Sequence, residues 1–159
     1  MSVSSVKRCE EKMETRKIVS GKLGEIEFQE SDIITLSAPM LGFPELNDFI
    51  LISNEKSYPF LWFQSVQDVN ICFILVEPEI FFPDYKPEVS KRDIKILSVE
   101  ENKGVKVFGI VVVPDQPKNA TVNLRAPLVL NMEKKLAKQV ILEDDKWQIK
   151  SPLFQNQEK

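Results

Sequence analysis

The sequence predicts an all-β protein, a small antiparallel β-barrel-like domain of about ten short strands with at most one or two short helices. Short runs rich in β-branched and aromatic residues recur along the chain, and Gly, Pro, Asn or Asp bounds most of them. Helical segments between these runs are nearly absent, which disfavours βαβ units. With 159 residues the chain is long enough for one core and too short for two comfortable domains.

The N-terminal third is predicted to contain a hairpin, a third strand and a loop. Residues 1–14 hold little that could pack and are expected to form a mobile N-terminal extension. The predicted strands are RKIVS (16–20), LGEIEF (23–28) and DIITL (32–36). Residues 20–22, Ser-Gly-Lys, supply the hairpin turn between the first two. Two prolines and a glycine in APMLGFPEL (38–46) exclude a helix or a central strand there, so this run is a loop.

The rest of the chain continues the same pattern. The further predicted strands are FILIS (49–53), FLWFQSV (60–66), ICFILVE (71–77), VKVFGIVVVP (105–114), TVNL (121–124), LVLN (128–131) and KQVILE (138–143). One short helix is predicted to start at Ser90, whose side chain can cap the next turn, with Ile94 and Leu97 on one face. We therefore expect a single β-barrel-like domain over 15–154 and a C-terminal tail over 155–159.

Composition excludes several classes of function. Lys and Arg number 21 against 24 acids, for a net charge of −3, so direct nucleic-acid binding is not expected. Histidine is absent, which removes His ligands and His-dependent catalysis. Nucleotide-binding and metalloprotease motifs are missing as well, so no enzyme activity, cofactor or metal is expected.

The compartment is predicted from cysteines and hydropathy. Cys72 lies in an apolar run and is expected to be a buried small hydrophobe, whereas Cys9 is expected to be an exposed thiol. The N-terminus lacks the apolar region of a secretory signal, and no apolar stretch is long enough to cross a membrane. These features predict a cytoplasmic protein.

One segment is both acidic and rich in aromatic residues. Residues 54–90 carry six acids against two lysines and eight of the 14 aromatic residues. Prolines keep EPEIFFPDYKP (77–87) out of a regular ladder, so this run is predicted to be a loop. The candidate partner-binding residues are Glu77, Glu79, Phe81, Phe82, Asp84 and Tyr85, because aromatic residues supply contact area and carboxylates select partners by charge. In the alternative interpretation, Phe81 and Phe82 plug one end of the barrel and Tyr85 braces the loop.

Two asparagines bracket the run LRAPLVL. Asn123 and Asn131 are predicted to bond neighbouring backbone groups and shape turns, and Pro127 is predicted to interrupt the ladder between them. A structural role is therefore expected for both asparagines rather than partner contact.

Several runs, taken in order, resemble the signature blocks of the flagellar assembly factor FliW family. They are WFQSVQD, EPEIFFPDY, VVVPDQP, TVNLRAPLVLN and KQVILED, which begin at Trp62, Glu77, Val111, Thr121 and Lys138. The match runs from about Met13 to Leu153. The sequence departs from the family pattern in LSAPMLGF (36–43), at Trp147, where tyrosine is common, and at Ser151, which replaces a histidine.

The resemblance implies a non-catalytic, β-barrel-like protein that binds flagellin in the bacterial cytoplasm. It also implies a second partner, the translational regulator CsrA, whose repression of flagellin synthesis proteins of this kind antagonise. Flagellin and CsrA are expected to compete for a factor that is a monomer when unbound. The alternative from another class is a small-molecule-binding or enzymatic β-barrel with a pocket lined by the FFPDY loop. A cavity with convergent buried polar groups would favour that alternative, and a filled barrel with an acidic patch outside would favour protein binding.

Overall fold

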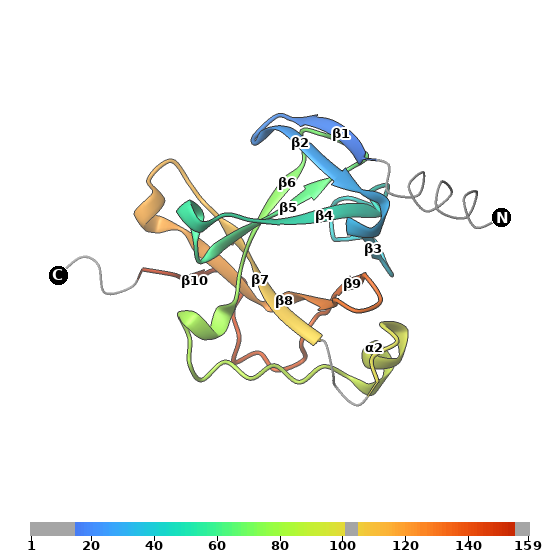
Figure 1. The fold of residues 1–159 in the computed structure, drawn as a ribbon. Coiled ribbons are helices and arrows are strands. Elements are labelled where there is room, and N and C mark those ends of the chain that lie inside the picture. Colours follow the sequence, from blue (N-terminus) through green and yellow to red (C-terminus); the bar gives the residue numbers. More distant parts are fainter. Residues whose placement is uncertain (1–14, 101–104, 155–159) are drawn as a thin grey trace.

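The computed structural model describes residues 15–100 and 105–154 and shows an all-β fold with one short α-helix in these ranges (Figure 1). The first strands are β1 (Thr15–Ser20), β2 (Gly24–Gln29), β3 (Ile33–Leu36), β4 (Asp48–Ser53), β5 (Phe60–Ser65) and β6 (Cys72–Val76). They are followed by α2 (Lys91–Ile96), β7 (Val105–Val112), β8 (Thr121–Asn131), β9 (Leu136–Gln139) and β10 (Ser151–Pro152). The all-β prediction is confirmed. The predicted extension, tail and Cys9 lie outside the described residues.

Seven strands close into a barrel. The strand order is β8-β7-β6-β5-β4-β3-β9, and β9 pairs again with β8, while β10 pairs with the first two residues of β8, Thr121 and Val122. All of these pairs are antiparallel except β3 with β9, whose register Thr35↔Leu136 and Leu36↔Ala137 is parallel. The expected antiparallel barrel is thus confirmed, and this closing pair is its one parallel exception among the described strands. The reason is that β3 and β9 meet only in the tertiary fold and share no connecting turn.

The hairpin of β1 and β2 forms a separate two-stranded sheet beside the barrel (Figure 1). Its turn follows Ser20, as predicted, because the register ends at the pair Ser20↔Gly24. The Ser20 hydroxyl accepts hydrogen bonds from the amides of Lys22 and Leu23 at 3.1 and 3.0 Å. Gly24 has a φ of +79°, in the left-handed region that favours glycine.

β8 is one strand of 11 residues, where the sequence predicted two. Pro127 interrupts the ladder with β7, whose register jumps from Phe108↔Leu128 to Ile110↔Asn123. On the other edge the ladder continues, because the Pro127 carbonyl accepts the Val140 amide at 2.9 Å. The proline is accommodated in a bulge, which explains why the strand does not end there. β9 also begins two residues before the predicted run at 138 and ends at Gln139.

The two asparagines have the predicted structural roles. Asn123 Oδ1 accepts the amides of Arg125 and Ala126 at 3.1 and 2.9 Å and so holds the bulge of β8. Asn131 is 2% exposed, and its Nδ2 donates to the Leu97 carbonyl at 2.7 Å. Asn131 Oδ1 also accepts two amides of the turn that leads to β9. Both side chains are therefore occupied by backbone groups of the fold.

Alternate side chains of the barrel strands enter two different clusters. Leu75, Leu128 and Leu130 belong to an interior cluster, whereas Val76 and Val129 face outward. The interior cluster draws on all seven barrel strands and comprises Ile34, Leu36, Met40, Phe49, Phe63, Leu75, Phe108, Leu128, Leu130 and Ala137. The outer cluster comprises Val76, Tyr85, Leu97, Val111, Ala120, Val122, Leu124, Val129, Val140, Leu142 and Leu153. The molecule thus has one core inside the barrel and another on the outer face of β6, β7 and β8.

Two irregular segments cover this outer face. They are residues 77–99, between β6 and β7, and residues 140–154 at the C-terminal end, and both run along the same side of the barrel in Figure 1. The first contains α2, which is capped as predicted: Ser90 Oγ accepts the Asp93 amide at 3.1 Å. The pair Lys138 Nζ to Asp93 Oδ1, at 2.7 Å, joins α2 to β9.

The Asp93–Lys138 pair is expected to make stability depend on pH. Burial acts to raise the pKa of Asp93, but the hydrogen bonds from Lys138 and Ser90 outweigh it and the pKa lies below its ordinary value. The carboxylate therefore stabilises the fold above the unfolded pKa of about 3.9, and this contribution is lost as pH falls through the lower folded value. We expect Asp93→Asn to cost about 1 to 2 kcal/mol at pH 7 in urea unfolding.

The difference from wild type should shrink progressively as pH falls below about 3.9. Asp84→Asn, which changes an exposed acid in the same segment, is the matched control and should track wild type throughout. A loss for Asp93→Asn that is the same at pH 3 and pH 7 would contradict the proposed linkage.

Candidate partner-binding surface

The segment after β6 is held close to the barrel by a proline and a glycine. η3 (Pro78–Ile80) starts with the buried Pro78, whose carbonyl accepts the Phe81 amide at 3.0 Å. A Cβ added to Gly109, which lies opposite Val76 in the ladder, would sit 2.4 Å from Val122 Cγ2 and 3.4 Å from Pro78 Cγ. Only glycine therefore allows η3 and β8 to approach this point of β7 so closely.

Tyr85 faces the outer cluster and not the solvent. Its side chain is 1% exposed, its hydroxyl donates to the Leu124 carbonyl at 2.7 Å, and its ring meets Trp147 edge-on with centroids 4.7 Å apart. Burial raises the pKa of Tyr85, so the phenol stays protonated as a donor. This placement confirms the alternative interpretation for Tyr85, which braces the loop.

Phe81 and Phe82 are partly buried against the same outer cluster. The Phe81 ring centroid lies 6.1 Å from that of Phe60 and 5.9 Å from that of Phe154. The alternative interpretation expected these two rings to plug one end of the barrel. Neither ring does so, because residues 77–99 run along the outside of the barrel. Their outer edges remain partly accessible.

The acidic side chains lie on the outside of this segment. Glu79 and Asp84 are exposed, and Glu77 is partly buried with Lys106 Nζ 3.8 Å from its carboxylate. The apolar side chain of Ile80 lies among them and is 44% exposed. We call Glu77, Glu79, Ile80, Phe81 and Asp84 the η3 surface. Acidic groups at the rim with apolar atoms between them are suited to contact with another protein. That these residues contact a partner stays a prediction.

One exposed aromatic residue was missed by the sequence argument. Tyr58 is 75% exposed and lies two residues before Phe60. Phe60 pairs across the ladder with Val76, the residue just before the η3 surface. The peptide bond between Tyr58 and Pro59 is cis. The signal that could have found Tyr58 is its position before a proline, in a turn where a large ring has no core to enter.

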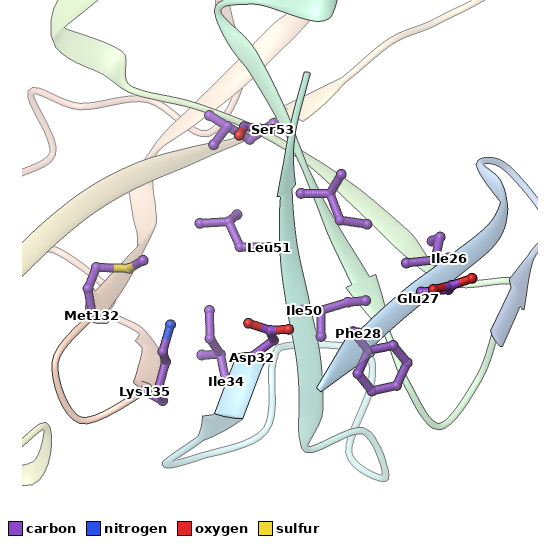
Figure 2. A pocket seen from close by; sticks show the side chains of 12 residues that line it. Ile26, Glu27, Phe28, Asp32, Ile34, Ile50, Leu51, Ser53, Met132 and Lys135 are labelled. Atoms are coloured by element: carbon purple, nitrogen blue, oxygen red, sulfur yellow. The ribbon is translucent and has the colours of Figure 1, made fainter. Parts of the chain in front are cut away.

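The barrel interior is occupied by the interior cluster. Its centre is filled by side chains, among them Phe49 and Phe63, whose rings stack with centroids 4.4 Å apart. A hollow of about 470 Å³ does lie beside β4 (Figure 2). Figure 2 places Ile26 and Phe28 of β2 on one side of β4, and Met132 and Lys135 of the β8–β9 turn on the other.

This hollow does not fit the small-molecule alternative. Its lining comes from β2 to β5 and the β8–β9 turn, and no residue of the FFPDY loop contributes to it. No buried polar side-chain atom of the described residues lacks a hydrogen-bond partner, so no convergent polar groups await a ligand. No group of three acidic or cysteine side chains within residues 15–100 and 105–154 could hold a metal ion. Cys72 itself is partly buried, less than predicted, and burial raises the pKa of its thiol.

The run WFQSVQD forms the end of β5 and the start of the turn to β6, and side-chain hydrogen bonds hold it. Gln64 is fully buried; its Nε2 donates to the carbonyls of Ser65, Val69 and Ile71 at 3.0 to 3.2 Å. Its Oε1 accepts the Ser20 hydroxyl at 2.6 Å, which ties the β1–β2 hairpin to the barrel. These residues of the family signature therefore maintain the fold.

Comparison with known proteins gives consistent matches over most of the chain. A family model described as FliW protein matches residues 17–153. A flagellar assembly factor FliW from Thermosipho africanus is 42% identical over 83% of this chain and 92% of its own length. Another from Natranaerobius thermophilus is 36% identical over 89% of this chain and 94% of its own. A crystal structure of the flagellar assembly factor FliW superposes with a TM-score of 0.83 at 34% identity, covering 89% of this chain and 99% of that one.

Proposed function

The chain belongs to the FliW family of flagellar assembly factors, and on this premise we propose that it is a cytoplasmic, non-enzymatic binding protein with two partners. The first is flagellin, which it binds as a chaperone. The second is the translational regulator CsrA, whose repression of flagellin synthesis it antagonises. The chain itself contacts no nucleic acid and is a monomer when unbound. Within the described residues, no helix is both long and apolar enough to cross a membrane.

The observation that carries this proposal is the chemistry of the η3 surface. An RNA-binding regulator neutralises phosphates with Lys and Arg, so its surface is basic and complements acids. Glu79 and Asp84 are exposed carboxylates on an ordered segment, and Ile80 supplies apolar contact between them. A rim of charge around an apolar centre is the usual composition of a protein interface.

The switch in this proposal is competition by mass action. A factor occupied by flagellin has less free surface for CsrA, and export of flagellin frees it again. Competition needs no conformational change, only overlapping or mutually exclusive sites. Flagellin supplies the apolar component in this scheme, since amphipathic helices dock their apolar face into a hydrophobic groove.

Asp84→Lys is expected to slow association with CsrA at low salt, with a smaller effect at high salt. The charge reversal lies on an exposed loop position, so the free energy of unfolding should stay within about 0.5 kcal/mol of wild type. A rim charge acts mainly on the association rate and is screened within about 8 Å at physiological salt. Surface plasmon resonance at two salt concentrations measures both effects.

Asp115→Lys provides the matched control, because it makes the same charge change at an exposed position before η4 (Pro117–Asn119). It should slow association less than Asp84→Lys. Equal association rates for Asp84→Lys and wild type at low salt would remove the η3 surface from the CsrA interface. If the wild-type chain binds neither purified flagellin nor purified CsrA, the two-partner function itself is overturned.

A further inference from the structure

The backbone edge of the chain after β9 is open. On the β8 side, the amides of Val140 and Leu142 donate to the carbonyls of Pro127 and Arg125 at 2.9 and 2.8 Å. In an extended chain alternate residues direct their backbone groups to opposite edges, so those of Ile141 and Glu143 point away from β8. Within the described ranges these two amides donate to no backbone carbonyl. β3 does not cover this edge, because its pairing with β9 ends at Leu36↔Ala137.

A groove of about 620 Å³ adjoins this edge. One wall is residues 140–144 with Trp147, and the other is the covering segment from Lys86 to the start of α2. The apolar part of the groove includes Val89, Val140 and Leu142. Chain lies on both sides of the groove, which suits a single extended segment better than a second sheet.

The opposite face of the edge is apolar and exposed. Ile141 is 60% exposed, and Leu41, whose amide donates to Gln139 Oε1 at 3.1 Å, is 65% exposed. Exposed edges are normally blunted by lysine, proline or a bulge, because they otherwise recruit another strand. Residues 139–143, QVILE, contain neither lysine nor proline, and their one charged residue, Glu143, is the last of the run. This edge is therefore built to pair.

Charge in the groove favours a basic occupant. Glu88, Glu143 and Asp144 line it against the lysines Lys86 and Lys91. The remaining carboxylate, Asp93, is already taken by Lys138 at 2.7 Å. Two of the three acids, Glu143 and Asp144, lie at the end of the edge.

We propose that residues 139–143 bind an extended segment of a partner protein, which adds to the sheet as a strand beside β9. Main-chain hydrogen bonds to Ile141 and Glu143 supply the affinity. Alternate apolar side chains of the segment enter the groove and cover Ile141, and a lysine or arginine faces Glu143. This docking edge is separate from the η3 surface and does not depend on the proposed function.

A second copy of this chain is a poorer occupant than a peptide. The free edge spans only residues 139–143, whereas a stable dimer interface buries roughly 1,200 Å² or more. The covering segment beside the groove also restricts the approach of a whole domain. Neither restriction applies to a single extended peptide.

The test is selection of phage-displayed random decapeptides on the immobilised full-length chain, with comparison of Ile141→Pro and Ile141→Val. Proline removes the free amide but breaks no hydrogen bond of the fold, and an edge position tolerates it. Valine keeps the amide and a β-branched side chain. We expect selected peptides with alternating apolar residues and a Lys or Arg, whose affinity falls at least about tenfold for Ile141→Pro and is nearly unchanged for Ile141→Val.

Hydrogen exchange gives a second readout that does not rely on the proline variant. The amides of Ile141 and Glu143 should exchange rapidly in the free chain and become protected when a selected peptide binds, and N-methylation of alternate peptide residues should abolish binding. The proposal is overturned if the selected peptides bind Ile141→Pro as well as wild type, or if no peptide is selected. It is equally overturned if the two amides are already protected in the monomer, or if light scattering shows a dimer that Ile141→Pro dissociates.

Discussion

Replacing Gln64 by methionine is expected to lower the free energy of unfolding by about 3 kcal/mol, although the side-chain volume hardly changes. The amide group of Gln64 is fully buried: its two N–H donors are shared among three carbonyls within 3.2 Å, and its oxygen accepts the Ser20 hydroxyl. Methionine removes the side-chain donors of this network and the acceptor of the Ser20 hydroxyl, although the Val69 and Ile71 carbonyls keep the amides of Gly21 and Ser65. Urea unfolding followed by circular dichroism measures the loss, which corresponds to a fall in Tm of roughly 10 °C.

Gln64→Glu separates hydrogen bonding from shape in the same position. Its carboxylate would face three carbonyl oxygens, and an unpaired buried charge is far costlier than a missing hydrogen bond. Burial raises the pKa of the introduced acid above its unfolded value, so the variant loses stability as pH rises. We expect Gln64→Glu to be less stable than Gln64→Met at pH 7 and similar to it near pH 4. A Gln64→Met chain as stable as wild type would show that this network contributes specificity and not free energy.

Truncation of Tyr85 to alanine is expected to cost about 3 to 5 kcal/mol, comparable to the loss of a core aromatic residue. Tyr85 anchors residues 77–99 to the outer cluster through its ring and through the 2.7 Å hydrogen bond to the Leu124 carbonyl. Tyr85→Phe keeps the ring and should cost about 1 to 2 kcal/mol for the lost hydrogen bond. Thermal unfolding of both variants, with CsrA binding measured on the folded protein, checks the assignment.

CsrA binding distinguishes a bracing residue from a contact residue. If Tyr85 only braces the loop, Tyr85→Phe should keep the wild-type association rate, in contrast to Asp84→Lys. A Tyr85→Phe variant with unchanged Tm and weakened binding would show that the hydroxyl reaches the partner in the complex. That result would require the loop to detach from the outer cluster.

Local sequence pattern predicted most of the strands but not their long-range pairing. Runs such as FILIS and FLWFQS have the β-branched and aromatic content of strands, and the helix cap at Ser90 follows from the hydrogen-bonding capacity of serine. The parallel pair of β3 and β9 has no local signature, because it depends on where the intervening strands lead the chain. Pro127 predicted a break, and only the tertiary fold shows that its carbonyl still serves Val140.

The candidate site was predicted as a segment rather than as individual contacts. The acids and prolines of EPEIFFPDY predicted an exposed loop, and Glu79 and Asp84 are exposed. The rings could not be assigned from sequence, because an irregular segment has no period that separates an inner from an outer face. Tyr85 is turned inward by the outer cluster, most of whose other members come from distant parts of the chain, namely β6, β7, β8 and the C-terminal segment.

The parallel pair of β3 and β9 also determines when the barrel can form. Thr35 and Leu136 are about 100 residues apart in the chain, so bringing them together costs roughly 4 kcal/mol in loop-closure entropy. The hairpins between them are local and can pair first. On the ribosome, β3 has to wait with an unpaired edge until β9 has been synthesised and has left the exit tunnel, because domains fold as their residues emerge. Closure therefore comes only after β9 has emerged, and until then the nascent chain exposes the edge of β3 to its surroundings.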